Sequence, residues 1–143
     1  MGVHRLGLAV VAALFMSASG AAAAPLPGIK TPTRNISCFA VGTTLLCDIK
    51  QAAYLHTAQN ACMARSSLDW HGFELHPTGR AQLLCAGGVM YDEGRDMPIF
   101  RVLAYGRTWR HGGYTCTSRS TGLTCTSASG HGLFLSRASY RLF

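Results

Sequence analysis

The segment CFAVGTTLLC, residues 38–47, decides the fold, because its two cysteines bracket eight residues with a glycine near the centre. Gly42 and Thr43 can form a two-residue type II′ hairpin turn, which favours glycine at its first position. Counting outward from that turn, Cys38 faces Cys47 in a non-hydrogen-bonded pair, whose Cα atoms lie about 4.5 Å apart. A disulfide can bridge that distance. The segment therefore predicts a disulfide-closed β-hairpin.

The segment CTSRSTGLTC, residues 116–125, repeats the spacing. Gly122 lies one place past its midpoint, so a simple turn and a turn with a glycine bulge both fit. The remaining cysteines, Cys62 and Cys85, then pair by exclusion. An even number of cysteines in a small exported domain indicates a disulfide framework rather than a metal site. The predicted disulfide residues are Cys38, Cys47, Cys62, Cys85, Cys116 and Cys125.

Strand signals recur at short intervals through the rest of the chain. Apolar or alternating runs bounded by Gly, Pro or Asp lie at Phe73–His76, Ala81–Cys85, Ile99–Tyr105 and Leu133–Leu135. Residues 51–65 have helical spacing and predict one short helix. The fold class that follows is all-β and mostly antiparallel, a small disulfide-stapled sandwich or rolled sheet. If the last strand continues unbroken from Leu133, Arg137 and Arg141 share a face opposite Phe134.

The N-terminus has the three parts of a secretory signal peptide. A positive start, Met1–Arg5, precedes the apolar run Leu6–Met16 and a stretch of small residues. That run is shorter than the roughly 20 residues of a membrane span. We expect residues 1–23 to be a cleaved signal peptide, residues 24–34 a loose N-terminal arm, and residues 35–143 a single domain. The mature chain is expected in the periplasm or the medium, with no transmembrane segment.

Charge is distributed unevenly along the chain. Residues 24–100 carry six Lys or Arg and six Asp or Glu, whereas residues 101–143 carry six arginines and no acid. Guanidinium groups bind phosphate and carboxylate in bidentate fashion. The sequence therefore predicts a non-catalytic module that binds an anionic envelope component or polymer; we do not expect nucleic acid as the partner. The candidate anion-binding residues are Arg101, Arg107, Arg110, Arg119, Arg137 and Arg141.

Two other functional classes compete with this interpretation. An exported inhibitor or effector would present an exposed apolar loop, for which Asp92–Pro98 is the candidate. A small hydrolase would use Ser136 as nucleophile, His131 as base, and Asp48 or Asp69 to orient the base. The Gly-x-Ser-x-Gly elbow of many hydrolases is missing from the sequence. We therefore do not expect an enzyme.

Histidines and aromatic residues add two further possibilities. His71, His111 and His131 could hold zinc or copper, but their spacing does not favour it, and we expect no metal and no cofactor. Aromatic side chains could form a stacking platform for sugars or bases, although in a small β domain they more often build the core. The aromatic candidates are Trp70, Tyr105, Trp109, Tyr114 and Tyr140.

Several segments resemble an uncharacterised family of small secreted bacterial domains. They are Thr31–Cys38, Cys47–Ile49, Tyr105–Trp109, Gly113–Cys116, Gly122–Cys125, Gly130–Arg137 and Tyr140–Phe143. The resemblance covers nearly all of the mature chain. It implies a six-cysteine secreted domain without implying an activity, because that family has no assigned function. Arg34 departs from the pattern, since family members tend to have glycine there.

Overall fold

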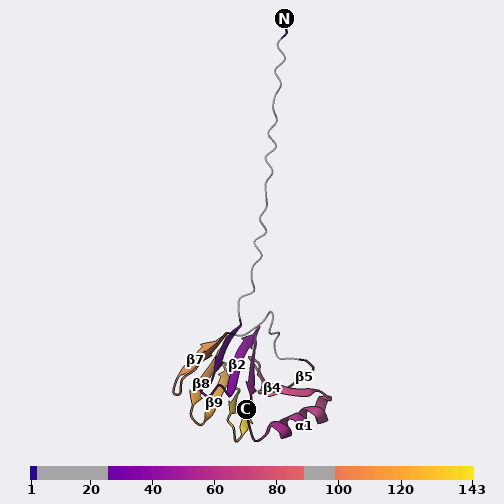
Figure 1. Ribbon diagram of the computed structural model, residues 1–143, viewed down its shortest axis with the longest axis vertical. Coiled ribbons are helices and arrows are strands. Elements are labelled where there is room, and N and C mark those ends of the chain that lie inside the picture. Colours follow the sequence, from indigo (N-terminus) through magenta and orange to yellow (C-terminus); the bar gives the residue numbers. More distant parts are fainter. Residues whose placement is uncertain (3–25, 89–98) are drawn as a thin grey trace.

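Two β-sheets and one short helix make up the fold in the computed structural model, which describes residues 1–2, 26–88 and 99–143. The sheets face each other as a sandwich (Figure 1). The predicted fold class is confirmed, because the strands are mostly antiparallel and the helix is short. Residues 3–23 of the predicted signal peptide and the loop Asp92–Pro98 lie outside the described residues.

Sheet A has six strands in the order β5-β4-β3-β2-β1-β6. The pair β1–β6 is parallel and the other pairs are antiparallel. The strands are β1 (Pro27–Lys30), β2 (Ile36–Val41), β3 (Thr44–Ile49), β4 (Asp69–Leu75), β5 (Gln82–Ala86) and β6 (Ile99–Val102).

Sheet B has five antiparallel strands in the order β11-β10-β9-β8-β7. Burial alternates along β8 and β9, which is typical of strands with one face on the core and one toward solvent. The strands are β7 (Thr108–His111), β8 (Tyr114–Arg119), β9 (Gly122–Ser127), β10 (Gly132–Leu135) and β11 (Tyr140–Leu142).

The two hairpins predicted from cysteine spacing are both present. In the first, Cys38 faces Cys47 across the turn Gly42–Thr43, and the two Cα atoms are 4.1 Å apart. Gly42 has φ 55°, as the first position of a type II′ turn requires. The second hairpin has continuous register from Tyr114–Ser127 to Arg119–Gly122, so its turn is the simple two-residue one and not a bulge.

The three disulfides join Cys38 to Cys47, Cys62 to Cys85, and Cys116 to Cys125. These are the pairs that the spacing predicts. The two hairpin disulfides meet inside the sandwich, because the sulfurs of Cys38, Cys47 and Cys125 all lie within 4.8 Å of one another. They therefore occupy the centre of the core, where each sheet contributes one cross-link.

Tyr114 links the two sheets by hydrogen bonds. Its side chain points inward from β8 and is 2% exposed. The hydroxyl donates to the backbone oxygens of Leu75, at 2.9 Å, and of Thr43. Both acceptors belong to sheet A or its hairpin turn, so this one side chain fixes the distance between the layers at that end of the core.

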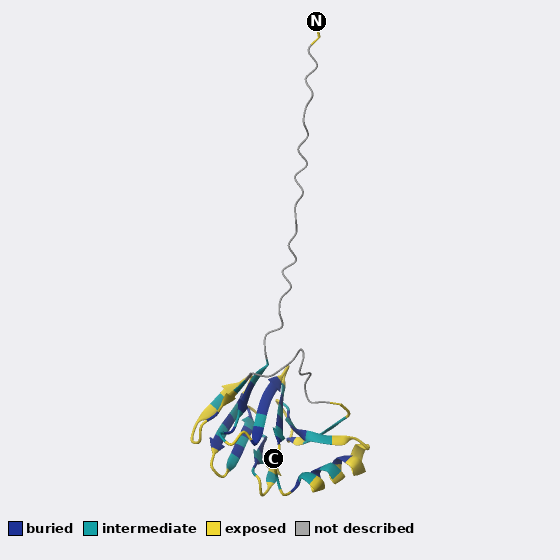
Figure 2. Ribbon diagram, viewed as in Figure 1, coloured by how far each residue is buried: buried dark blue, intermediate teal, exposed yellow. Residues whose placement is uncertain are grey.

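The helix α1 (Leu55–Ser66) lies beside β4 and β5, away from β7 and β8 (Figure 1). Ala58 and Cys62 are its buried residues, and the disulfide from Cys62 to Cys85 joins it to β5. The helix ends at Ser66, and the next residue, Ser67, has a left-handed backbone and donates its N–H to the oxygen of Met63. Figure 2 shows that much of the helix and the hairpin turns are exposed. None of the helices in the described residues is long and apolar enough to cross a membrane.

Two expectations are corrected by the structure. Residues 27–30 are not part of a loose arm, because β1 fills the gap between β2 and β6 and buries Ile29. The chain after Leu133 is not one unbroken strand, because Ser136 and Ser139 close a turn between β10 and β11. As a result Arg141 pairs with Phe134, and the two side chains share a face.

Candidate functional site

The outer side of sheet B presents two rows of threonines. The first row runs across the strands as Thr108, Thr117 and Thr124, and it continues to Phe134 and Arg141. In this row the hydroxyls of Thr108 and Thr117 lie 3.1 Å apart. The cysteines beside these threonines point inward to the core, so strand alternation forces the threonines outward.

The second row contains Arg110, Thr115 and Thr126. Both rows together form a surface that we call the threonine face. Five strands spaced about 4.8 Å apart make it roughly 19 Å wide. It consists of Thr108, Arg110, Thr115, Thr117, Thr124, Thr126, Phe134 and Arg141.

The threonine face is electropositive. Arg110 and Arg141 are exposed at its two edges, and Arg119 is exposed at the end of β8, on the same side as Thr117. The guanidinium of Arg141 lies 5.4 Å from the ring centre of Phe143. No Asp or Glu occurs in residues 99–143, which contain the whole of sheet B. The face therefore offers cations and hydroxyls, and its own sheet contains no Asp or Glu side chain to neutralise them.

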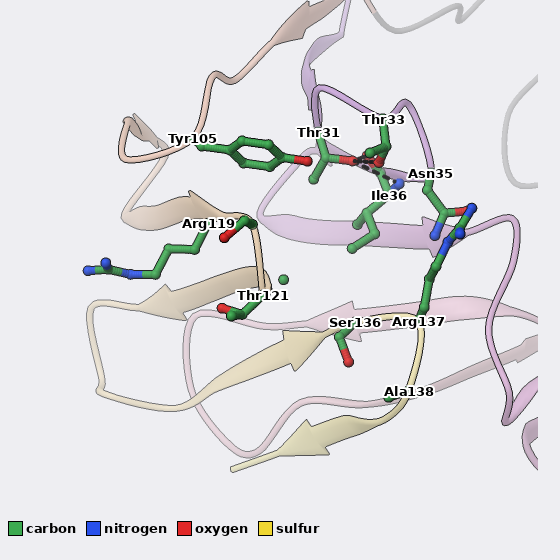
Figure 3. Close-up of a pocket in the computed structure, with 12 residues that line it drawn as sticks. Thr31, Thr33, Asn35, Ile36, Tyr105, Arg119, Thr121, Ser136, Arg137 and Ala138 are labelled. Atoms are coloured by element: carbon green, nitrogen blue, oxygen red, sulfur yellow. Dashed lines mark hydrogen bonds between the residues drawn. The ribbon is translucent and has the colours of Figure 1, made fainter.

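A pocket of about 370 Å³ opens at one end of the sandwich, and we call it the end pocket. Four segments from distant parts of the sequence meet there (Figure 3). Tyr105 points across it toward Thr31, whereas the guanidinium of Arg119 points away from the labelled residues. The lining residues are Thr31, Thr33, Asn35, Ile36, Tyr105, Arg119, Ser120, Thr121, Gly122, Ser136, Arg137 and Ala138.

Hydrogen bonds hold the walls of the end pocket in place. Thr31 closes the loop before β2, since its side-chain oxygen accepts from the N–H of Ile36 at 3.2 Å. Asn35 binds the backbone of Gln51 twice, accepting at 2.9 Å and donating at 3.0 Å. Arg137 donates to the side-chain oxygen of Gln51 at 2.7 Å. The loop 31–36 and the turn after β10 are thus both anchored to the segment that precedes α1.

The six candidate arginines do not form one patch. Arg110, Arg119 and Arg141 lie on or beside the threonine face, and Arg119 and Arg137 line the end pocket. Arg101 belongs to β6 in sheet A. Arg107 lies in the turn before β7, where its carbonyl accepts from the N–H of Ser118.

The hydrolase candidates are not assembled into a site. Ser136 and His131 flank the two ends of β10, which places them roughly 16 Å apart along an extended strand. The Ser136 hydroxyl donates to the carbonyl of Ser139 instead. Asp48 belongs to β3 of sheet A, where burial raises its pKa to about 6, and Asp69 accepts a hydrogen bond from Gln59.

The candidate metal ligands are also separated. His71 belongs to β4, His111 to β7, and His131 precedes β10. Among the described residues, one group of three His, Cys, Asp or Glu side chains brings its ligand atoms within 4.8 Å of one another. That group is Cys38, Cys47 and Cys125, whose sulfurs are bonded in disulfides.

Most of the aromatic candidates contribute to the core and do not form a platform. Trp70 and Tyr140 pack on Phe73, at ring-centre distances of 5.5 and 5.1 Å. Tyr114 is buried, and Trp109 is half-buried against His111. Tyr105 is the exception, since it is 46% exposed and lines the end pocket.

Sequence reasoning missed the threonines, although a signal for them was present. Each hairpin cysteine of sheet B is flanked on both sides by threonine, in Thr115-Cys116-Thr117 and Thr124-Cys125-Thr126. If the cysteines point inward, the period of two in a strand places all four threonines on the outer face. The end pocket had no comparable signal, because its walls come from four separate segments.

Comparison with known proteins gives the chain a family but no activity. No curated protein and no solved structure gave a match. Residues 9–143 match the model of a family of unknown function. On that match, which spans nearly the whole sequence, the chain belongs to the family of unknown function DUF6636.

Proposed function

We propose that the protein is a non-catalytic exported module that binds an anionic polymer across the threonine face. The observation that carries this proposal is the arrangement of Arg110, Arg119 and Arg141 around five outward threonines on a sheet with no acidic residue. Cations at three positions can contact successive anionic groups of one chain. The threonine hydroxyls between them can donate to or accept from polar groups of the same chain.

The proposed binding depends on repetition and not on one strong contact. An exposed ion pair contributes at most about 1 kcal/mol of binding free energy, so a single arginine on this surface would bind an anionic group only weakly. A polymer meets several arginines at once, and each contact after the first is intramolecular, which raises the overall affinity. The disulfide between Cys116 and Cys125 lies beneath the face and holds β8 and β9 together. A rigid surface loses little conformational freedom on binding.

Export is part of the same proposal. Three disulfides form and persist in oxidising compartments, and the described residues contain no free cysteine. The abundant polyanions in such compartments are envelope glycolipids and wall polymers. We therefore propose an acidic envelope or extracellular polymer as the partner.

Affinity chromatography on immobilised polygalacturonate tests the proposal. The wild-type protein should be retained at low salt and eluted as salt rises, because screening weakens exposed charge pairs. The double variant Arg110→Gln/Arg141→Gln should bind up to about thirtyfold more weakly, which corresponds to two exposed ion pairs.

The matched control is Lys50→Gln/Arg65→Gln, which removes the same charge from exposed positions outside sheet B. It should be retained like the wild type. Equal losses in the two double variants would show that net charge alone causes retention, and the proposal would fail. Tighter retention on double-stranded DNA than on polygalacturonate, in both variants, would also contradict it.

A further inference from the structure

We infer that the end pocket binds one carboxylated sugar residue, at the end of an anionic polysaccharide or on a branch of it. This inference rests on the proposed function, because it assigns a class of sugar to the polymer. The end pocket adjoins the threonine face through Arg119, which lies two residues beyond Thr117 on the same side of β8. Those two positions are about 7 Å apart along a strand.

The size of the end pocket suits one residue of a polysaccharide. Its volume of about 370 Å³ falls at the small end of the range for ligand pockets, which is about 300–1,000 Å³. An extended chain needs a long open surface, which the threonine face supplies. The pocket therefore suits a chain end or a side branch, and the face suits the chain itself.

The lining chemistry favours a ligand that is both anionic and hydroxylated. Arg119 and Arg137 supply two guanidiniums, and the lining contains no Asp or Glu. Guanidinium groups match the planar, two-oxygen geometry of a carboxylate. Thr33, Tyr105 and Thr121 add hydroxyls that can pair with the hydroxyls of a sugar ring.

The two guanidiniums differ in how firmly they are held. Arg137 is fixed by its hydrogen bond to Gln51 at 2.7 Å. Among the described residues its other guanidinium N–H groups have no hydrogen-bond partner, so they can donate to a ligand. Arg119 has no polar side-chain partner within the described part of the chain, and Figure 3 shows it directed outward. We expect Arg137 to provide a preformed contact and Arg119 to turn toward the carboxylate when the sugar binds.

Titration of the protein with glucuronic acid, followed by NMR or calorimetry, tests the inference. We expect saturable millimolar binding of glucuronic acid and much weaker binding of glucose, which has the hydroxyls without the carboxylate. Arg119→Gln and Arg137→Gln should each reduce the affinity for glucuronic acid by about tenfold or more, as expected for loss of a hydrogen bond to a charged group. Thr121→Val, which preserves both charges, should weaken binding by a smaller factor.

Controls separate this inference from the proposed function. Arg110→Gln/Arg141→Gln should bind glucuronic acid like the wild type even though it binds the polymer more weakly. Far-ultraviolet circular dichroism checks that every variant is folded. If an arginine variant does not fold, the affinity of Thr121→Val for glucuronic acid is the test of the pocket instead. Three results would each overturn the inference. Glucose could bind as tightly as glucuronic acid, equimolar sulfate could compete completely with glucuronic acid, or glucuronic acid could show no saturable binding at millimolar concentration. Retention on polygalacturonate in that case would leave the proposed function standing.

Discussion

Asp48 gives the clearest test of the energetics of the fold. Asp48 lies on β3, an interior strand of the six-stranded sheet, and pairs with Ser37 on β2. Its side chain is half-buried on the face opposite that of the inward Cys47 and Ile49. Burial raises the pKa of Asp48 from 3.8 to about 6, and the nearby charge of Lys50 only partly offsets that rise. The folded protein therefore holds this carboxyl in an environment that disfavours its charge.

The sign of the pH dependence follows from that shift. Between pH 4 and 6 the folded state keeps a proton on Asp48 that the unfolded state has already released. Stability therefore falls as pH rises through this window, and the loss is complete above pH 6. At 1.36 kcal/mol per pKa unit, the difference between 3.8 and about 6 corresponds to about 3 kcal/mol. Asp48→Asn removes the charge, so it should stabilise the protein by up to about 3 kcal/mol at pH 7.5.

Urea unfolding at pH 7.5 and pH 3.5, followed by tryptophan fluorescence on the oxidised protein, measures this effect. The gain from Asp48→Asn should be present at pH 7.5 and absent at pH 3.5, where the wild-type carboxyl is already protonated. Asp69→Asn is the control, because Asp69 is exposed and the replacement keeps an acceptor oxygen for Gln59. An equal gain at both pH values, or a loss of stability at pH 7.5, would refute the argument from burial.

Four further predictions concern stability, each measured by urea or thermal unfolding. Gly132→Ala should lower the free energy of unfolding by about 3 kcal/mol or more, because a Cβ there would collide with the backbone oxygen of Cys125 and with the ring of Phe143. The control Gly87→Ala should be nearly neutral, because a Cβ at Gly87 meets no atom within 4 Å. Arg34→Gly should stabilise by about 0.5–1 kcal/mol, since Arg34 has φ 56°; a loss would show that this side chain makes a compensating contact. Tyr114→Phe should cost about 1–3 kcal/mol by leaving the Leu75 and Thr43 carbonyls without their donor, and an unchanged midpoint would argue against the link between sheets. Replacing both Cys62 and Cys85 by Ala should cost about 3 kcal/mol for a separation of 23 residues, and a native-like midpoint would mean that α1 docks without its cross-link.

The Arg34 prediction also explains a departure seen in the sequence. The family resemblance drawn from the sequence implies glycine at this position. The backbone of Arg34 is left-handed here, in the loop where its N–H bonds the oxygen of Thr31. Glycine adopts this conformation without a steric penalty, so the backbone here favours glycine.

Local patterns in the sequence predicted much of the fold. The eight residues between Cys38 and Cys47, with glycine near the centre, predict turn, register and disulfide together, because in a tight hairpin the turn fixes which residues face each other. The helical spacing of residues 51–65 predicted α1, which spans Leu55–Ser66. These predictions succeeded because each depends on residues close together in the chain.

The errors arose where pairing is long-range. Pro27–Lys30 has few strand-favouring residues, so its sequence predicts an arm, yet β1 joins β2 to the distant strand β6. The break between β10 and β11 depends on the hydrogen bonds of Ser136 and Ser139, which a run of apolar and polar residues does not reveal. In neither case does the local sequence favour the observed structure over the alternative, which is a loose arm for residues 27–30 and one unbroken strand after Leu133.

The sequence by itself determined the disulfide framework, the β-rich class and the excess of arginine in the last third of the chain. Only the tertiary structure decided which arginines lie on the same surface. Arg110 and Arg141 lie on opposite edges of one sheet face, and Arg119 and Arg137 both line the end pocket, because strand order and layer packing place them there. The charge composition counts arginines without regard to their positions in space. The arginines that share a surface are determined by which strands are neighbours, and strand order depends on the pairing of segments far apart in sequence.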